Sequence, residues 1–223
     1  METIRGSAFT EPFPHLIFSN FYNEEELNLI WEELNFYTKP DKLFEAKDFG
    51  GVVDWTNSHA IQLDNLYVGK FRSISNILTV NRKLFDPDIL KSFAKIHECC
   101  EGCVIANTDI TKVRYYHDKE YYKPHTDWFQ PHSEEYETNA LSWGQRTWTV
   151  QIALNEPSSG GEISFPELEG FKPFILPMGG LIAWNNISKE GEVQELAVYE
   201  HKPVLGGEKC ILTKHFRMKN VIE

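Results

Sequence analysis

The sequence lacks the features expected of a secreted, membrane-bound or nucleic-acid-binding protein. Basic side chains are scarce, with 22 Lys and Arg against 33 Asp and Glu and a net charge of −11. This balance argues against a general binder of nucleic acid or anionic membranes. No segment approaches membrane-spanning length, and the first seven residues, METIRGS, contain no apolar run of the signal-peptide kind. We therefore expect a cytoplasmic protein that binds neither nucleic acid nor membrane.

Cysteine is also scarce, and its four positions do not suit a disulfide framework. Cys99, Cys100 and Cys103 are crowded together, and Cys210 stands alone. Adjacent cysteines without a second CxxC pair form a poor zinc site. We expect reduced thiols, as in a cytosolic protein.

The remaining composition is that of an ordinary globular protein. Of the 223 residues, 41% are hydrophobic and 25% are charged, and this length suits one domain with a real core. Glycine and proline recur through the second half, which favours short strands joined by turns. We predict a single mainly β (α+β) domain over 1–223, with a helical support region at 1–103 and a β core at 104–217.

In the support region, we expect a short strand within 10–20 and then an amphipathic helix over 23–37. Asn23 precedes three glutamates, which is typical of a helix start. Further helices are expected around 64–80 and from Asp86 onward, because apolar residues recur there at helical spacing. Residues 38–60 are polar and are expected to be irregular.

The β core is predicted to contain a series of short strands separated by Gly/Pro turns. They are expected near 104–106, 109–116, 121–125, 147–154, 162–165, 174–176, 180–184, 196–199 and 210–216. The long stretch 128–144 between two of them is predicted to be a loop, and its aromatic residues indicate a lid. Many short strands favour a sandwich or closed β fold.

His125 and Asp127 form the first chemical motif of the core. They are two residues apart, so on an extended strand both side chains leave the same face. An imidazole and a carboxylate that converge in this way can hold a metal, and a second histidine would complete the facial triad of non-haem Fe(II) oxygenases. His-x-Asp alone is weak evidence, because most occurrences are polar surface.

Several further motifs, in order, make the second half resemble the prolyl 4-hydroxylase-like group of 2-oxoglutarate/Fe(II) dioxygenases over roughly 104–217. The matching segments are Tyr116-(x5)-Tyr122-x-Pro124-His125-x-Asp127, Arg146-x-x-Thr149 with Leu154-Asn155, Gly160-Gly161-Glu162-Ile163-Ser164-Phe165-Pro166, Gly180-Leu181-Ile182-Ala183-Trp184 and Pro203-Val204-Leu205-x-Gly207-Glu208-Lys209-(x3)-Thr213-Lys214. The proline-rich opening at 12–17 also looks like this group.

The resemblance implies a double-stranded β-helix (jelly roll) with helices packed against one sheet. It also implies Fe(II), with 2-oxoglutarate and O₂ as co-substrates and ascorbate as an accessory reductant. Oxidative decarboxylation of 2-oxoglutarate would give succinate and CO₂ while a C–H bond is hydroxylated. The expected substrate is a peptidyl proline. The same chemistry on a free amino acid or small metabolite, and a non-catalytic binding module, are the alternatives.

The resemblance also assigns residues to the iron and to the co-substrate. His125 and Asp127 would bind iron. The far carboxylate of 2-oxoglutarate would be buried, where an unpaired charge is costly, so a fixed cation is required. Lys209 matches that position, and Thr149 and Tyr116 would donate hydrogen bonds to the same carboxylate.

Three other residues are candidates for substrate contact. Arg146 and Arg217 are expected near the mouth of the site. Trp128 follows Asp127 directly and could close over the substrate.

The third iron ligand departs from the family pattern. That histidine usually lies four residues before the proline and ten before the lysine, and here these counts give Tyr199. We take His201, eight residues before Lys209, as the third ligand after a two-residue deletion, with Tyr199 as the alternative. Both share strand parity. His215, where the family commonly has tryptophan, is a second departure that could tune or supplement the metal site.

Overall fold

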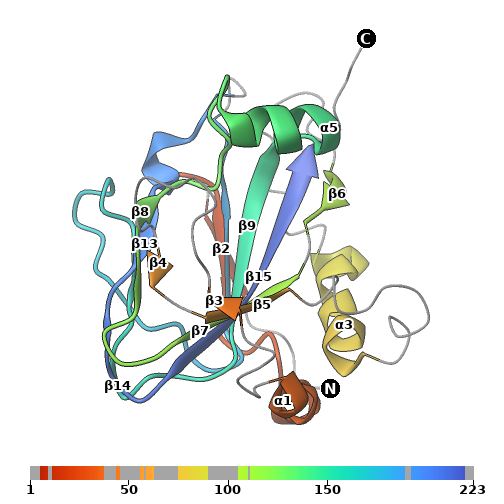
Figure 1. Cartoon of the computed structure of the whole chain (residues 1–223), viewed down its shortest axis with the longest axis vertical. Helices are drawn as coiled ribbons and strands as arrows, with labels where there is room; N and C mark the ends of the chain where they lie inside the picture. The colour runs from red at the N-terminus through yellow and green to blue at the C-terminus, as the bar shows by residue number, and fades with distance from the viewer. Residues whose placement is uncertain are drawn as a thin grey trace.

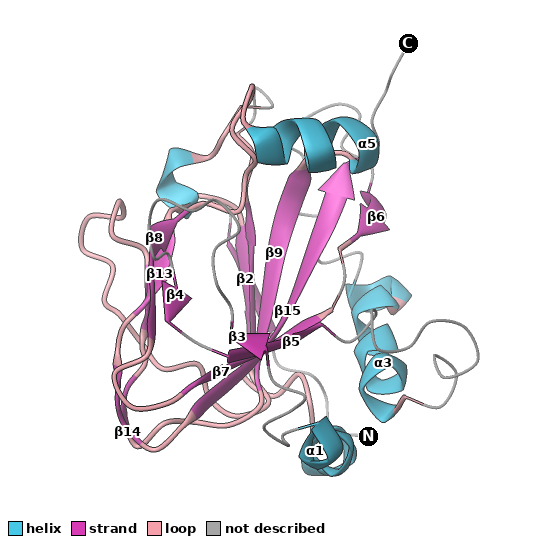
Figure 2. Cartoon of the chain, viewed as in Figure 1, coloured by secondary structure: helices cyan, strands magenta, loops and turns pink. Residues whose placement is uncertain are grey.

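The computed structural model describes residues 6–9, 12–37, 44–45, 56–57, 59–62, 75–89, 105–109, 111–188 and 192–218. Two antiparallel sheets face each other across the interior (Figures 1 and 2). The larger sheet has the order β1-β2-β12-β9-β15-β7-β5-β3, and β6 also pairs with β15. The smaller sheet has the order β11-β13-β8-β4, and β10 pairs separately with β14. All strand pairs within these sheets whose register is given are antiparallel.

The strands of the larger sheet are β1 (Gly6–Phe9), β2 (His15–Phe18), β3 (Phe44–Glu45), β5 (His59–Gln62), β6 (Ile105–Thr108), β7 (Lys112–Tyr116), β9 (Arg146–Ala153), β12 (Leu181–Asn185) and β15 (Lys209–Met218). The smaller sheet and the separate pair comprise β4 (Thr56–Asn57), β8 (Tyr121–His125), β11 (Ile163–Ser164), β13 (Tyr199–His201), β10 (Ser159–Gly160) and β14 (Val204–Gly206). The helical elements are α1 (Glu24–Tyr37), α3 (Asn76–Asn81), η2 (Arg82–Phe85), η3 (Tyr136–Ala140), α5 (Leu141–Trp143) and η4 (Glu195–Ala197).

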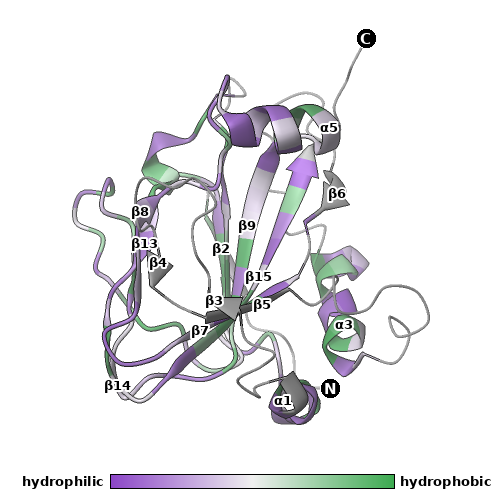
Figure 3. Ribbon diagram, in the orientation of Figure 1, coloured by the Kyte–Doolittle hydropathy of each residue, from purple (hydrophilic) through white to green (hydrophobic). Residues whose placement is uncertain are grey.

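The central strand β15 shows how the chain separates core from site. Its residues Leu212 and Phe216 are fully buried in the hydrophobic cluster on the helical side. Thr213 and His215, which alternate with them, line a pocket on the other side. Successive side chains of a strand point to opposite faces, so one strand serves both purposes. Both hydrophobic and hydrophilic residues accordingly occur along β9 and β15 (Figure 3).

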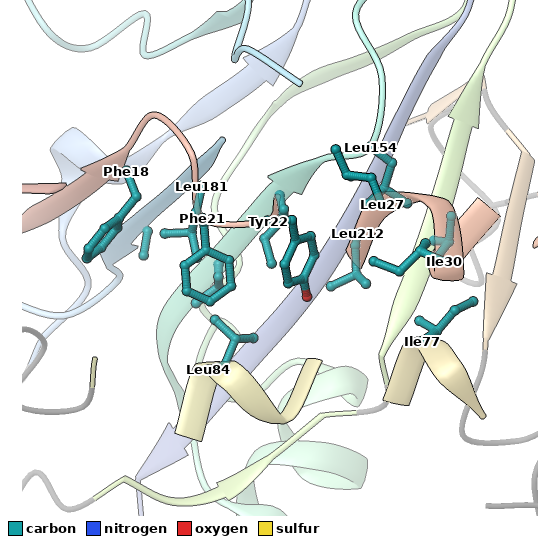
Figure 4. Close-up of a cluster of buried hydrophobic side chains, with 14 of the residues drawn as sticks. Phe18, Phe21, Tyr22, Leu27, Ile30, Ile77, Leu84, Leu154, Leu181 and Leu212 are labelled. Carbon is teal, nitrogen blue, oxygen red and sulfur yellow. The ribbon is translucent and has the colours of Figure 1, made fainter. Parts of the chain in front are cut away.

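The outer face of the larger sheet is covered by α1, α3 and η2 (Figure 1). Asn23 caps α1 through a reciprocal pair of 2.9 Å hydrogen bonds with Glu26, which is a capping box. The side chains that join the helices to the sheet include Phe18, Phe21, Tyr22, Leu27, Ile30, Ile77, Leu84, Leu154, Leu181 and Leu212 (Figure 4). No helix in the described parts of the chain is long and apolar enough to cross a membrane.

A second hydrophobic cluster fills one end of the space between the sheets. The rings of Phe165 and Trp184 lie 5.3 Å apart, and those of Trp184 and Tyr199 lie 4.6 Å apart, both in edge-on orientations. Such aromatic pairs stabilise a core beyond simple burial. The rest of the interior contains a small third hydrophobic cluster of Tyr116, Val204 and Ile211 together with the polar side chains of the candidate site.

The N-terminal region differs in part from the prediction. The strand within 10–20 and the helix over 23–37 are confirmed by β2 and α1. Of the helix expected at 64–80, α3 covers the end, and 63–74 lie outside the described residues. The region contributes strands as well as helices, because β2 and β5 pair with β12 and β7 of the core.

The expectation of irregular structure across 38–60 is wrong for its described parts, which are strands β3, β4 and the start of β5. These segments extend both sheets through backbone pairing. A ladder of backbone hydrogen bonds needs no apolar side chains, so composition did not reveal it. The helix expected from Asp86 is present at 87–89, and its continuation lies outside the described residues. Of the four cysteines, only Cys210 lies within the described residues, where it is buried and free.

Three local predictions in the core also need correction. The stretch 128–144 contains the π-helix η3 and the short helix α5 and is not a loop throughout. The Ser133 hydroxyl accepts a hydrogen bond from the backbone N–H of Tyr136 and thereby supports the start of this helical segment. The strand expected at 196–199 begins only at Tyr199, because η4 precedes it, and the strand expected at 174–176 is reduced to a single bridge between Phe174 and Ile163.

Candidate metal centre and active site

His125 is the last residue of β8, and one of its ring nitrogens is already hydrogen-bonded. Its Nδ1 lies 2.7 Å from the backbone oxygen of Lys123. A carbonyl oxygen can only accept, so Nδ1 carries the proton and Nε2 keeps its lone pair. Burial lowers the pKa of His125, which favours the neutral ring. The Nε2 atom is buried without a hydrogen-bond partner in the described structure and lies 3.8 Å from Asp127 Oδ1.

The Asp127 carboxylate is the centre of the polar interior. Thr149 donates a 2.6 Å hydrogen bond to Asp127 Oδ2. Asn186 in turn donates to the Thr149 oxygen at 2.9 Å, which leaves the Thr149 proton for the carboxylate. Burial alone would raise the pKa of Asp127, but His215, His125 and Arg146 outweigh it and lower the pKa below its usual range. Asp127 is therefore ionised and fixed in orientation.

His215 lies between two carboxylates. Its Nε2 is 3.3 Å from Asp127 Oδ2, and its Nδ1 is 3.4 Å from Asp109 Oδ2. Neither contact has hydrogen-bond geometry, and both nitrogens are buried and unpartnered within the described residues. The parity of β15 places this ring in the interior, in the same direction as Thr213.

Asp109 binds both arginines that were predicted to contact substrate. Arg146 reaches Asp109 Oδ2 through Nε at 2.8 Å and Nη2 at 2.7 Å, and Arg217 Nε donates to Asp109 Oδ1. Arg217 also donates to the backbone oxygen of Gly144 at 2.7 Å. Both guanidinium groups lie over the Phe129 ring, at 4.4 Å and 5.2 Å from its centre. The arginines are thus held together in one buried ion-pair network.

Tyr199 occupies the position opposite His125. The two residues are register partners in the β13–β8 pair, and their rings lie 4.3 Å apart. His201 pairs one step further along, with Tyr122, across a register shift. Of the two predicted candidates for the third ligand, Tyr199 is therefore the register partner of His125, and His201 is not.

His201 faces a cation. Its Nδ1 lies 2.7 Å from the Nζ of Lys209, which also donates to the backbone oxygen of Gly161 at 2.5 Å. Burial, and next the Lys209 charge, lower the pKa of His201 well below its usual value, so the ring is neutral. Because lysine can only donate, Nδ1 accepts and the proton of the ring stands on Nε2. This arrangement is the reverse of the one at His125.

Of the three residues predicted to bind the co-substrate carboxylate, Lys209 and Tyr116 are neighbours, whereas the Thr149 hydroxyl donates to Asp127. The Lys209 ammonium is 5.5 Å from the centre of the Tyr116 ring, and burial lowers the pKa of Lys209 to about 7. The Tyr116 hydroxyl is buried with no hydrogen-bond partner in the part of the chain that the structure describes. It is free to bind a ligand, whereas the Thr149 proton goes to Asp127.

The pocket beside Asp127 is small, with a cavity volume of about 50 Å³. Its lining comprises Lys112, Arg114, Tyr116, Tyr122, Asp127, Arg146, Gln151, Tyr199, Ile211, Thr213 and His215. Three of these side chains are cationic, and the only formal anion among them is Asp127. Such a lining suits an anionic ligand.

Asp109, Lys112 and Arg114 belong to the site but were not predicted from the sequence. A signal existed for the two cations, because 112, 114 and 116 share parity on one strand and Tyr116 had already been placed in the site. Asp109 precedes that strand, and only the tertiary structure brings it to the two arginines. Of the remaining predicted contact residues, Trp128 is partly buried, and its backbone N–H is bonded to the Thr126 hydroxyl.

No three His, Cys, Asp or Glu side chains among the described residues already stand at metal-ligand spacing. The donors nevertheless fit a borderline metal in two respects. His125 presents an unpartnered, buried Nε2, and Asp127 is an ionised carboxylate beside it. Imidazole and carboxylate with further open positions are the donors of non-haem Fe(II) sites.

Comparison with known proteins bears on the fold. No protein-family model matches the chain, and no curated protein matches its sequence. Among solved structures, it is similar to a viral collagen prolyl hydroxylase from Paramecium bursaria Chlorella virus-1, in complex with 2-oxoglutarate, at a TM-score of 0.64 and 18% identity over 92% of this chain and 96% of that one.

Two further prolyl hydroxylases share the architecture. A prolyl-4-hydroxylase from Pseudomonas putida aligns at a TM-score of 0.58 and 15% identity over 92% of this chain and 93% of that one. A prolyl hydroxylase from Trichoplax adhaerens, bound to a peptide fragment of hypoxia-inducible factor, aligns at a TM-score of 0.64 and 13% identity, over 92% of this chain and 83% of that one. These similarities confirm the predicted fold class: the chain is a double-stranded β-helix with helices on one sheet.

Proposed function

We propose that this chain is an Fe(II)- and 2-oxoglutarate-dependent dioxygenase that hydroxylates a C–H bond of a peptidyl residue, with proline as the first candidate. One observation carries the proposal. The His125–Asp127 pair is buried beside a cation-lined pocket, with the ring tautomer that a metal requires already set by the Lys123 carbonyl.

In this proposal His125 and Asp127 hold the iron, which would supply the oxidative decarboxylation that is coupled to C–H hydroxylation. Thr149 orients Asp127, and Asn186 fixes the Thr149 hydroxyl. The Lys123 carbonyl holds the His125 ring. Outer hydrogen bonds of this kind tune ligand basicity and position.

The co-substrate is a dicarboxylate, and the pocket offers cations at several places. Lys209 and Tyr116 remain the proposed partners of its far carboxylate, and Lys112 and Arg114 add positive charge along the pocket wall. Burial lowers the pKa of Lys112 to about 8 and of Lys209 to about 7. A bound carboxylate would favour the charged form of both lysines, because opposite charges stabilise each other in a buried site.

A peptide substrate is favoured over a free amino acid by the surface of the segment after Asp127. Trp143 is 61% exposed and Leu141 is 49% exposed, and α5 lies at the end of β9 and β15 (Figure 1). Exposed apolar side chains beside a pocket suit contact with an extended chain. Arg146 and Arg217 are occupied by Asp109, so these apolar residues, together with Trp128, are the better candidates for substrate contact.

The test is turnover of 2-oxoglutarate to succinate, first without a peptide and then with a library of proline-containing peptides. We expect Fe(II)-dependent succinate formation that rises with a peptide substrate and is abolished in His125→Ala. Stimulation by free amino acids alone would move the substrate to the small-metabolite class.

A non-catalytic binding module is the second candidate, because Tyr199 stands where the family pattern has an iron ligand. Anaerobic titration separates the two candidates. Addition of Fe(II) and 2-oxoglutarate to a dioxygenase should produce the weak visible absorption of the chelate. Absence of this band, together with absence of succinate under every condition, would leave the binding module.

A further inference from the structure

We infer that His215 supplies the third protein ligand to the metal, in place of both His201 and Tyr199. The inference rests on the proposed function, because it concerns the metal that function requires. It is carried by one juxtaposition: the His125 and His215 rings each bring an unpartnered, buried Nε2 to the Asp127 carboxylate, from β8 and from β15.

Distances around Asp127 support the assignment. Two ligands about 2.1 Å from one metal and at right angles to each other are about 3 Å apart. The Nε2 atoms of His125 and His215 lie 3.8 Å and 3.3 Å from the two oxygens of Asp127. Both separations are longer than ligand spacing, so a metal would have to draw the three side chains together.

The second nitrogen of each ring faces an acceptor. His125 Nδ1 meets the Lys123 carbonyl at 2.7 Å, and His215 Nδ1 lies 3.4 Å from Asp109 Oδ2. His215 Nε2 also faces a carboxylate, Asp127 Oδ2 at 3.3 Å, so a metal bound between these two atoms would take the place of a proton there while Asp109 holds the proton on Nδ1. A carboxylate behind a ligating histidine is a recurrent outer-shell arrangement in metalloproteins. Asp109 therefore acts as a positioning residue for His215.

His201 has the opposite arrangement. Lys209 donates to its Nδ1 at 2.7 Å, so in the neutral ring the proton stands on Nε2, which then cannot bind a metal. Tyr199, opposite His125, is packed among Phe165 and Trp184 in the aromatic cluster. His201 Nε2 is also buried without a hydrogen-bond partner among the described residues, but it holds the ring proton, and Tyr199 has a hydroxyl and no nitrogen.

If His215 is the ligand, a single exchange of positions accounts for both departures from the family pattern, at Tyr199 and at His215. The family has histidine where Tyr199 stands and commonly tryptophan where His215 stands. An exchange of ligand between β13 and β15 keeps two imidazoles and one carboxylate around the same pocket, because both positions line it. The donor set of the facial triad is thus preserved from a different strand.

The experiment measures Co(II) binding to the full chain under anaerobic conditions, with Co(II) as an oxygen-stable probe for Fe(II). Titration calorimetry gives the affinity. Proton NMR of the Co(II) form gives the number of ligating rings, since each bound histidine with a protonated Nδ1 contributes one shifted, exchangeable signal. The variants are His215→Ala, His215→Gln, His201→Ala and, as a surface control, His132→Ala, each checked for folding by circular dichroism.

We expect two shifted ring signals in the parent and one in both His215 variants, with affinity reduced by more than about 100-fold, beyond the typical cost of losing an outer-shell partner. His201→Ala and His132→Ala should retain both signals and bind within about threefold of the parent. Asp109→Asn should reduce affinity by roughly 10- to 100-fold while keeping two signals.

The double variant Tyr199→His/His215→Trp, which restores the family arrangement, should recover the second signal. It separates loss of a ligand from loss of folding. Loss of a signal in His201→Ala with both signals kept in His215→Gln would overturn the inference and leave the proposed function standing. No Co(II) or Fe(II) binding by the parent would overturn both and leave His215 as a bridge within an ion-pair network.

Discussion

Two buried histidines, His201 and His215, occupy opposite electrostatic settings within one interior. Each has its Nδ1 next to a charged group: the Lys209 ammonium at 2.7 Å for His201 and the Asp109 carboxylate at 3.4 Å for His215. A cationic donor forces the ring proton onto Nε2, and an anionic acceptor draws it onto Nδ1. Lys209 thus keeps the proton of His201 on Nε2, whereas His215 has a carboxylate at each nitrogen, Asp109 at Nδ1 and Asp127 at Nε2.

The most severe test of this comparison removes the charge behind His215. Asp109→Asn leaves Arg146 and Arg217 without their shared carboxylate in a buried site. Breaking a buried ion pair by removing one partner typically costs about 3–5 kcal/mol. We expect the free energy of unfolding, measured in urea, to fall by that amount.

An exposed pair provides the matched control for Asp109. His117 and Glu208 lie 3.0 Å apart, but their side chains are 41% and 61% exposed. Surface ion pairs contribute about 0–1 kcal/mol, so Glu208→Gln should change stability within that range. Equal losses in Asp109→Asn and Glu208→Gln would contradict a structural role for the Asp109 network.

A second prediction concerns the charge beside His201 and is read from the pH dependence of stability. Burial lowers the pKa of Lys209 to about 7, whereas an unfolded lysine titrates near about 10.4. Between these values the unfolded chain binds more protons than the native chain, so this group makes stability rise with pH across that window. The slope is at most about 1.4 kcal/mol per pH unit.

Lys209→Met should remove the part of this rise that begins near pH 7 and leave the part due to Lys112, whose pKa burial lowers to about 8. Co(II) affinity should be nearly unchanged, since Lys209 is assigned to the co-substrate. Lys202→Met is the control, because the side chain of Lys202 is 41% exposed and should leave the pH profile as in the parent. A Lys209→Met profile that still rises like that of the parent from pH 7 to 10 would assign the effect to another group.

The third prediction concerns the hydroxyl that orients Asp127. Thr149→Val preserves shape but removes the 2.6 Å hydrogen bond to the carboxylate. Hydrogen bonds to charged groups contribute about 1.5–3 kcal/mol, and metal affinity should fall about tenfold through the loss of an outer-shell partner. Denaturation and Co(II) titration measure the two effects.

Thr147→Val is the companion substitution on the same strand. The Thr147 hydroxyl donates to the neutral backbone oxygen of Phe216 at 3.3 Å. The expected stability loss is about 0.5–1.5 kcal/mol, with unchanged Co(II) affinity. An equal fall in affinity for Thr147→Val would show that the effect of Thr149 is not specific to Asp127.

The smallest effect is expected at Tyr199. If the hydroxyl is not a ligand, Tyr199→Phe should bind Co(II) within about threefold of the parent, because the aromatic ring and its packing against Trp184 remain. Loss of metal binding in this variant, with His215→Gln unaffected, would restore Tyr199 as the third ligand.

Much of the frame was predictable because it depends on local patterns. The Asn23 cap with its three glutamates predicted α1, alternation of side chains predicted β7, and short runs between Gly/Pro turns predicted β9 and β15. The strands β3 and β4 were missed because they are held by backbone bonds to β5 and β8. The helical turn at 134–143 was missed because aromatic residues in a long polar stretch do not specify a π-helix.

The site divides in the same way. The His125-x-Asp127 spacing was readable from the sequence, but β8 ends at His125, so Asp127 lies in the bend after the strand and not on it as predicted. The match of Lys209 and Tyr116 to the family pattern was also read from the sequence and stays a prediction. The role of Asp109 could not be predicted from the sequence, because Asp109 and its partner Arg217 are 108 positions apart in the chain. Thr149 was predicted to contact the co-substrate, and the structure gives its proton to Asp127.

The sequence by itself determined several strands, the helix start and the two-residue spacing of an imidazole and a carboxylate, because these depend on adjacent residues. Only the tertiary structure decided which charge faces which histidine. Lys209 and Asp109 lie behind different rings because β13, β15 and the segment before β7 meet in space. The proton position of a buried imidazole depends on the charged groups at both of its nitrogens, and packing sets those groups.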